Sequence, residues 1–192
     1  MRKRRFIAMG EGRLEEISVF SECLFDGKVL HLYRDKVRLP SGAVSEREYC
    51  RHIGAVCVIP LLADGRVVME RQFRFAHGRV FFEIPAGKLD SKDEAPQMAA
   101  IRELKEETGA TAGKITYLGR VDTSPALIDE KIYMYLAEEL EFGERKLDED
   151  EFLDVELCPL SELYRMVMAG EISDAKTQIA VLKAAALRPQ FI

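Results

Sequence analysis

One short segment, residues 87–110, constrains the fold and the chemistry of this chain more than any other. A glycine turn precedes an amphipathic stretch, and Gly109 stops it directly afterwards. The pattern predicts a helix over residues 93–108, with Asp93 as its amino-terminal cap and Pro96 tolerated in its first turn. Apolar positions three residues apart predict the face that packs on a core: Met98, Ile101 and Leu104.

The same helix carries three carboxylates close together, which is unfavourable unless something compensates their charge. Glu103 and Glu107 lie one turn apart on one face, and Glu106 flanks them. Mg²⁺ prefers a few carboxylates with water and phosphate oxygens, so such a cation would remove the repulsion. The alternative is an ordinary solvated acidic face, with Arg102 and Lys105 in helix ion pairs. The glycines on both sides of the helix favour the metal site.

The remaining chain is expected to form strands around this helix and two helices at its end. Residues 55–62 are a nearly continuous apolar run, which predicts a strand covered on both faces. Three short strands within residues 1–52 cannot bury much surface alone, so they must pack on the rest of the chain or on another subunit. We therefore expect an arm over residues 1–52 and a main domain over residues 53–192. The other expected strands cover residues 66–74, 80–84, 114–121, 131–140 and 152–157, and the helices cover 160–168 and 173–187.

Composition excludes several classes of protein. The 192 residues are 47% hydrophobic and carry a net charge of −5, so the chain has enough apolar residues for a core and is not expected to bind nucleic acid. No apolar run is long enough to cross a membrane, and the start of the chain lacks the apolar region of a signal peptide. A cytoplasmic protein is expected. Cys23 and Cys57 alternate with apolar residues and are interpreted as buried free thiols.

Residues 87–110 resemble the signature of the Nudix hydrolases, G-x5-E-x7-R-E-U-x-E-E-x-G-U, in which U is apolar. The matching positions are Gly87, Arg102, Glu103, Leu104, Glu106, Glu107, Gly109 and Ala110. One position departs from the pattern. Counting back from Arg102 places the first signature glutamate at Glu94, with six residues after Gly87 in place of five, whereas counting forward reaches Asp93. Glu94 with one extra loop residue keeps the helix in phase, although the role of this position stays open.

Further segments resemble the ADP-ribose pyrophosphatase branch of that family. They are residues 71–74, 83–89, 124–125 and 173–177, together with the β-rich start of the chain. The resemblance implies an α/β fold, a Nudix-type α/β/α sandwich with a mixed sheet, extended by an N-terminal antiparallel β arm. It also implies that the arm supports a homodimer and contributes to the substrate cleft. Mg²⁺ is the implied cofactor, with Mn²⁺ as a substitute.

The resemblance also implies roles for individual residues. The Ala86 carbonyl, Glu103 and Glu107 would hold Mg²⁺, and Glu106 would hold another ion directly or through water. Arg102 would belong to the catalytic group. The residues expected to bind substrate are Arg74, Glu83 and Ser124.

A general base is expected outside the helix, since metal ligation lowers the basicity of a carboxylate. The acidic loop over residues 147–151 resembles the loop that carries the base in the ADP-ribose branch. Glu151 is the preferred base and Glu149 is the alternative.

The reaction implied is attack of water on one phosphorus of a diphosphate, which converts ADP-ribose to AMP and ribose 5-phosphate. A nucleotide sugar, NADH or a diadenosine polyphosphate is the alternative substrate. The chain has no tryptophan, so a base would have to stack on Phe, Tyr or Arg. A ligand-sensing regulator on a Nudix scaffold is the alternative from another class, disfavoured because all three helix glutamates are present.

Overall fold

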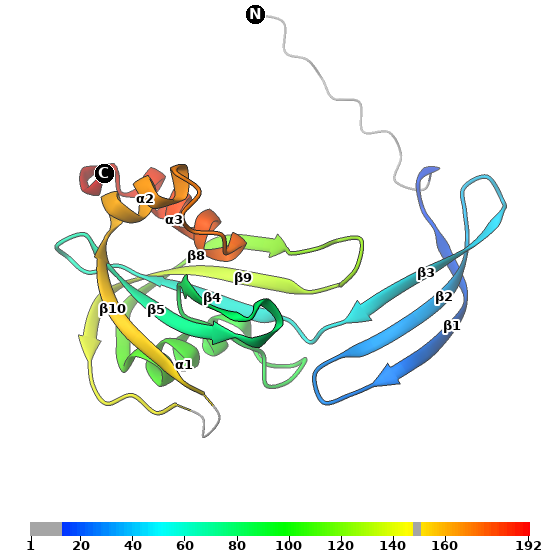
Figure 1. Ribbon diagram of the computed structural model, residues 1–192, viewed down its shortest axis with the longest axis horizontal. Helices are drawn as coiled ribbons and strands as arrows, with labels where there is room; N and C mark the ends of the chain where they lie inside the picture. The colour runs from blue at the N-terminus through cyan, green and yellow to red at the C-terminus, as the bar shows by residue number, and fades with distance from the viewer. Residues whose placement is uncertain (1–12, 148–150) are drawn as a thin grey trace, which may run out of the picture. The chain divides into compact units, whose positions relative to one another are not determined.

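The computed structural model describes residues 13–147 and 151–192, which form two compact units (Figure 1). The described residues up to His52 form the first unit together with Ser124–Asp129. Ile53–Thr123 and Glu130–Ile192 form the second. The short segment Ser124–Asp129 therefore belongs with the first unit, although the sequence assigned it to the main domain. It is tied there by backbone hydrogen bonds, which strand periodicity does not reveal.

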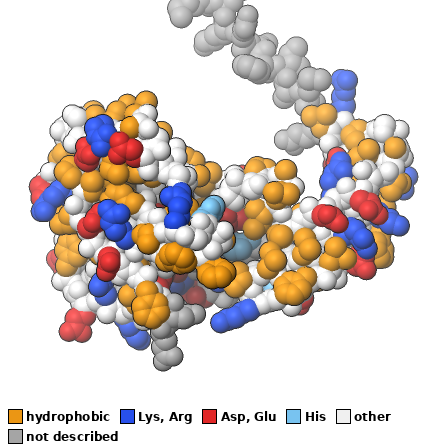
Figure 2. All heavy atoms as spheres, in the orientation of Figure 1, with side chains coloured by type: hydrophobic (Ala, Val, Ile, Leu, Met, Phe, Trp, Pro, Cys, Tyr) orange, Lys and Arg blue, Asp and Glu red, His pale blue; other side chains and the backbone are white. Residues whose placement is uncertain are grey.

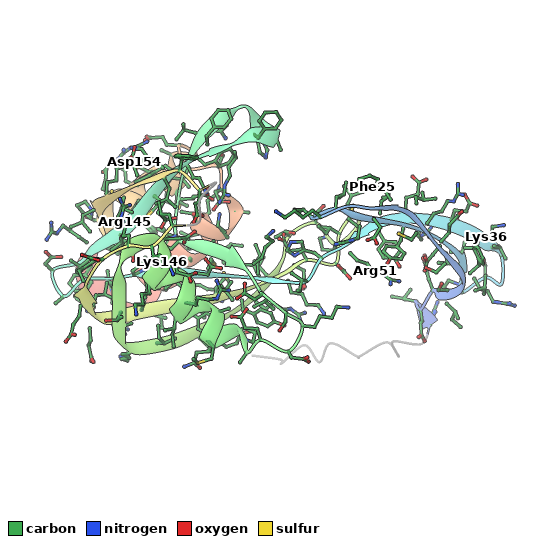
Figure 3. All side chains as sticks on the ribbon, turned by 90° about the horizontal axis from the view of Figure 1, so that it is seen from below. Phe25, Lys36, Arg51, Arg145, Lys146 and Asp154 are labelled. Carbon is green, nitrogen blue, oxygen red and sulfur yellow. The ribbon has the colours of Figure 1, made fainter. Side chains whose placement is uncertain are left out.

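The first unit is a three-stranded antiparallel sheet in the order β1-β2-β3. Its strands are β1 (Ile17–Asp26), β2 (His31–Arg38) and β3 (Val44–Arg51). The Cys50 N–H donates to the Leu127 carbonyl at 2.8 Å, which holds the segment Ser124–Asp129 against β3. Phe25 and Arg51 point from opposite faces of this sheet (Figure 3).

Hydrophobic side chains remain exposed over this small sheet (Figure 2). They are Ile17, Val19, Phe20, Leu24, Phe25, Val29, Leu30 and Val44. Three strands alone bury too little surface to hide them, as expected from the sequence. Cys23 is also exposed, so its predicted burial is wrong, whereas Cys57 is buried.

The second unit is built on a mixed four-stranded sheet in the order β7-β4-β9-β8. The neighbours β4 and β9 run parallel, and the other pairs are antiparallel. The strands are β7 (Ala86–Lys88), β4 (Ala55–Pro60), β9 (Lys131–Phe142) and β8 (Ala110–Asp122). A second, antiparallel sheet has the order β10-β5-β6, with β10 (Leu153–Pro159), β5 (Arg66–Arg74) and β6 (Arg79–Glu83).

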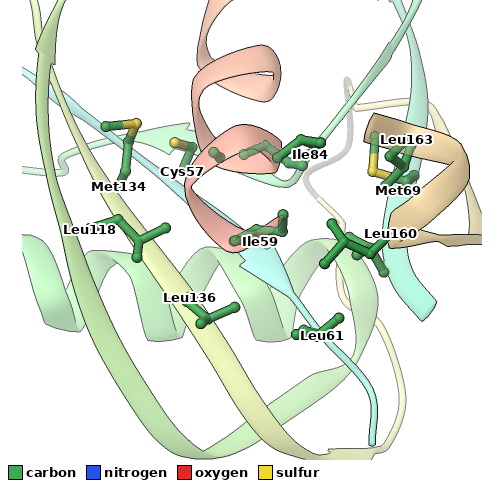
Figure 4. Close-up of a cluster of buried hydrophobic side chains, with 14 of the residues drawn as sticks. Cys57, Ile59, Leu61, Met69, Ile84, Leu118, Met134, Leu136, Leu160 and Leu163 are labelled. Carbon is green, nitrogen blue, oxygen red and sulfur yellow. The ribbon is translucent and has the colours of Figure 1, made fainter. Parts of the chain in front are cut away.

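Strand β4 is buried along its whole length, which confirms the prediction of a strand covered on both faces. Val56 and Val58 pack with α1 (Pro96–Thr108) on one face. Cys57 and Ile59 face the opposite core, which α2 (Leu160–Met168) and α3 (Ala175–Leu187) cover (Figure 4). Helices thus cover both faces of the sheet. Two 3₁₀ turns complete the unit, at Phe75–His77 and Pro189–Phe191. No helix among the described residues is long and apolar enough to cross a membrane.

Helix α1 differs from its prediction in its start and its buried face. It begins at Pro96, Ala95 occupies the cap position without a side-chain hydrogen bond, and Asp93 lies in the preceding turn. Proline suits the first helical position because that N–H has no partner within a helix. Met98 is 60% exposed, so its predicted core position is wrong. The buried face consists of Ala99, Ala100, Leu104, Glu107 and Thr108.

Candidate active site

The short strand β7 lies against α1 and brings backbone close to two of the helix carboxylates. The Ala86 N–H donates to Glu107 Oε2 at 3.0 Å. The Glu103 carboxylate fills the space beside Gly87, where any side chain would collide with it. Glycine at position 87 therefore lets backbone and carboxylate approach closely. The family resemblance implied that the Ala86 carbonyl, Glu103 and Glu107 would hold a metal ion. In the structure the Ala86 N–H contacts Glu107, and Glu103 lies beside the neighbouring Gly87.

Arg102 neutralises the outer edge of this cluster. Its guanidinium donates to Glu103 at 2.8 Å and to Glu106 at 3.1 Å, and it also reaches Glu94 at 3.2 Å. Glu94 in turn accepts the Asp90 N–H at 2.6 Å, which braces the loop before the helix. Of the two candidates for the first signature glutamate, Glu94 is the one that contacts Arg102.

A separate ion-pair network holds Glu83, the residue expected to position substrate. One oxygen of its buried carboxylate accepts Arg74 Nε at 2.7 Å, and the other accepts Lys176 Nζ. Lys176 also donates to Asp174 at 3.1 Å, and Asp174 caps α3 by accepting the Thr177 N–H at 2.9 Å. The two predicted substrate residues, Arg74 and Glu83, are therefore direct partners fixed by the start of α3. Residues 173–177 belong to the segments that resemble the ADP-ribose pyrophosphatase branch, but no role of Lys176 was predicted.

Glu70 is a second buried carboxylate that sequence reasoning missed. It follows Val67, Val68 and Met69 on β5, lies directly opposite Glu83 on β6, and is only 1% exposed. Its Oε1 has no hydrogen-bond partner among residues 13–147 and 151–192. The sign of this residue in the sequence was a single glutamate at the end of an apolar strand segment.

Burial and crowding shift the titration of these acids. Burial raises the pKa of Glu107, and Glu70, Glu103 and Glu151 raise it further. Burial also raises the pKa of Glu70, with Glu83 and Glu151 adding to the effect. The pKa of Glu103 rises to about 6, because burial raises it more than the neighbouring Arg102 lowers it. The interior of the cluster is therefore short of positive charge, which is typical of functional sites.

The residues fit a divalent cation by the chemistry of their donors. Glu103 and Glu107 supply carboxylate oxygens close to the backbone of Gly87 and Ala86, and one oxygen of the buried Glu70 has no hydrogen-bond partner among the described residues. Hard cations such as Mg²⁺ select oxygen donors of this kind. In the described part of the chain no three His, Cys, Asp or Glu side chains are already spaced to hold an ion. Arg102 pairs with Glu103 at 2.8 Å and with Glu106 at 3.1 Å.

The structure gives fewer contacts for the remaining predicted site residues. Glu151 is half-buried, and its Oε1 accepts the Gln72 Nε2 donor at 3.4 Å, a long contact. Glu149 lies outside the described residues. Ser124 belongs to the first unit, where its carbonyl accepts the Leu127 N–H at 2.8 Å.

Comparisons with known proteins identify the class to which this fold and site belong. Residues 51–178 match the NUDIX domain family, and the chain is a member of that family. Over 88% of its length it is 45% identical to the ADP-ribose pyrophosphatase of Bacillus subtilis (strain 168), covering 91% of that protein. It is 42% identical to the methanol dehydrogenase activator of Bacillus methanolicus over 87% of this chain and 91% of that one.

Two further comparisons agree with these. The ADP-ribose pyrophosphatase of Mycobacterium tuberculosis (strain ATCC 25618 / H37Rv) is 37% identical over 95% of this chain and 88% of its own. A crystal structure described as an ADP compounds hydrolase superposes with a TM-score of 0.80 at 19% identity, covering 92% of this chain and 95% of that one. At that identity the superposition concerns the fold, and it confirms the predicted Nudix-type α/β architecture.

The raised carboxylate pKa values predict a pH-dependent stability when divalent cations are chelated. The folded protein holds protons on these acids above their usual pKa of 4.5, where the unfolded chain has already released them. The free energy of unfolding should therefore fall as pH rises from about 5 to about 8. Urea denaturation in EDTA across this range measures the fall, which Glu107→Gln should reduce. Equal slopes for the two proteins would contradict this account.

Proposed function

We propose that this chain is a Mg²⁺-dependent pyrophosphohydrolase that cleaves ADP-ribose to AMP and ribose 5-phosphate. The observation that carries the proposal is the meeting of Glu103 and Glu107 with the backbone at Ala86 and Gly87. Family membership supports the chemistry, and the two ADP-ribose pyrophosphatases among its relatives support the substrate. We retain the cytoplasm as its expected location.

The metal would be held by Glu103, Glu107 and the Ala86 carbonyl, with Glu106 at the exposed side. A bound divalent cation neutralises the charge of a diphosphate and makes a bound water more acidic. Mn²⁺ offers the same preference for oxygen donors and is proposed as a substitute. Arg102 is proposed to keep Glu103 and Glu106 oriented through its two hydrogen bonds.

Arg74 is proposed to bind the diphosphate of the substrate. Its Nε is occupied by Glu83, while its side chain remains 38% exposed. The terminal N–H groups of a guanidinium fixed in this way suit phosphate oxygens. Lys176 and Arg74 both donate to Glu83, so the orientation of Arg74 depends on a partner that is itself held in place.

Another substrate of the same class remains the alternative. GDP-mannose pyrophosphatase of Enterobacter sp. (strain 638) is 33% identical over 68% of this chain. A ligand-sensing regulator fits less well, because Glu103, Glu106 and Glu107 are all present at the site.

A substrate panel tests the proposed function. Purified protein with Mg²⁺ or Mn²⁺ is given ADP-ribose, GDP-mannose, NADH or a diadenosine polyphosphate, and coupled alkaline phosphatase reports phosphate release. ADP-ribose should have the highest kcat/KM.

Glu103→Gln or Glu107→Gln should lower kcat at least about a hundredfold, since each removes a charged metal ligand. Circular dichroism should show an intact fold. Near-normal turnover of either variant at saturating Mg²⁺ would exclude that residue as a ligand.

Glu151 is proposed as the general base that accepts the proton of the attacking water. Glu151→Gln should lower kcat by roughly 10²–10⁴ with little change in KM, which is the range for loss of a general base. Glu149→Gln is the matched control in the same loop. If Glu149→Gln has the lowered kcat and Glu151→Gln has a normal one, the general base is Glu149. Full activity in both would exclude a base in this loop.

A homodimer is proposed from the exposed apolar side chains of the first unit. Large exposed apolar patches mark interaction surfaces, and three strands alone cannot hide this one. Light scattering at micromolar concentration should give twice the mass of one chain. Phe20→Asp combined with Phe25→Asp should shift the protein toward the monomer, whereas Leu187→Asp, on exposed surface of the second unit, should not. A monomeric wild-type protein would refute the dimer.

A further inference from the structure

Lys176 is a buried lysine that the proposed hydrolysis does not place in contact with substrate. Its side chain is 10% exposed, and its ammonium donates to Glu83 Oε2 and, at 3.1 Å, to Asp174 Oδ2. Burial lowers the pKa of Lys176, but Asp174 and Glu83 together raise it more, so the net shift is upward. The ammonium is therefore charged at neutral pH, and both hydrogen bonds are charge-assisted.

The start of α3 fixes the position of Lys176 relative to Glu83. The buried Thr177 hydroxyl donates to Asp174 Oδ2 at 2.6 Å and accepts the Ile84 N–H at 3.0 Å. Ile84 directly follows Glu83, the last residue of β6. One end of one helix thus holds the backbone next to Glu83 and also supplies the ammonium that reaches its carboxylate.

Lys176 occupies one of the two oxygens of Glu83 and leaves the other to Arg74. That second oxygen accepts Arg74 Nε at 2.7 Å, and the terminal nitrogens of Arg74 have no protein partner among residues 13–147 and 151–192. Arg–carboxylate pairs are frequently bidentate, in which case a terminal nitrogen of the guanidinium is used as well. Because the Glu83 carboxylate is shared with Lys176, Arg74 contacts it through Nε alone.

We propose that Lys176 is a positioning residue for substrate binding, because its hold on Glu83 Oε2 keeps the terminal N–H groups of Arg74 available for the diphosphate. This inference rests on the proposed function, which assigns the diphosphate to Arg74. Without Lys176, both oxygens of Glu83 would be open to Arg74, and the pair would become bidentate. A terminal nitrogen of the guanidinium would then turn toward Glu83 and away from the substrate.

NMR of ¹⁵N-labelled arginine side chains tests the positioning without substrate or metal. The Arg74 signals are assigned by their loss in Arg74→Lys. In the wild type the terminal N–H groups of Arg74 should exchange rapidly with water, whereas in Lys176→Met they should become protected by pairing with Glu83. Lys183→Met is the matched control, since Lys183 lies on the same helix and donates to the Leu118 carbonyl at 2.6 Å. Unchanged Arg74 signals in Lys176→Met would overturn the proposal.

Steady-state kinetics with ADP-ribose and Mg²⁺ gives a second measurement. Lys176→Met should raise KM about tenfold with little change in kcat, the effect of weakening one charged hydrogen bond to the substrate. Lys176→Arg retains a charged donor and should recover part of this loss, and Lys183→Met should equal the wild type. A purely structural role would lower Tm and the active fraction but leave KM unchanged, and this result would contradict the proposal.

A double-mutant cycle shows whether Lys176 acts through Arg74. Lys176→Met should add little to the loss of kcat/KM that Arg74→Ala causes, because the residue through which Lys176 acts is already absent. Multiplying effects would mean that Lys176 acts by another route, which would overturn the proposal.

A second variant keeps the tests decisive if Lys176→Met does not fold. Removal of one partner from a buried ion pair is strongly destabilising, so Lys176→Gln, whose amide still donates a hydrogen bond, then takes its place in every measurement. If neither variant folds, Lys176 serves the structure and the proposal is wrong.

The outcomes separate this inference from the proposed function. Protected Arg74 signals in Lys176→Met, with no hydrolysis of any substrate by the wild type, would uphold the positioning of Arg74 and refute the function. Hydrolysis of ADP-ribose by the wild type, with unchanged Arg74 signals and KM in Lys176→Met, would uphold the function and overturn the role of Lys176.

Discussion

The structure of the second unit depends on how it accommodates its buried carboxylates. These carboxylates outnumber the Arg and Lys side chains that donate hydrogen bonds to them. Glu70, Glu83 and Glu107 are each at most 2% exposed, and two of them are direct cross-strand neighbours. Arg74 and Lys176 satisfy Glu83, and the Ala86 N–H contributes to Glu107. Because isolated buried charges are strongly destabilising, the remaining deficit has to be met by protonation or by a bound cation.

The fold supplies the rigid support that such a cluster needs. Strand β4 is buried on both faces, with α1 on one side and α3 on the other. Strand β7 pairs with β4, and this pairing fixes the position of Ala86 and Gly87 beside α1. The start of α3 delivers Lys176 to Glu83. Carboxylates from α1 and from strands β5 and β6 of one sheet are therefore held by packed elements rather than by loops, which favours precise geometry.

Local patterns in the sequence predicted the parts of the site that depend on spacing along one element. Glu103 and Glu107 share a face because they are one turn apart, and the apolar run of β4 indicated burial on both sides. The cap at Asp93 and the core position of Met98 were wrong, since the docking of α1 on β4 decides where the helix starts and which face is buried. Glu70 was missed although it ends an apolar strand segment, and the role of Lys176 could not be predicted, because its partner Glu83 is distant in sequence.

The cluster has two ends that differ in how their charge is balanced. At the outer end, Arg102 donates to Glu103 and Glu106, so the chain neutralises its own exposed acids. At the inner end, Glu70 and Glu107 receive no hydrogen bond from any Arg or Lys of the described residues. A cation attracted to the whole cluster gains most at the inner end, where the low dielectric strengthens its interaction with carboxylates. In the proposed metal site, this arrangement would favour a metal ion near Glu107 and the backbone of β7, while Arg102 pairs with the exposed acids.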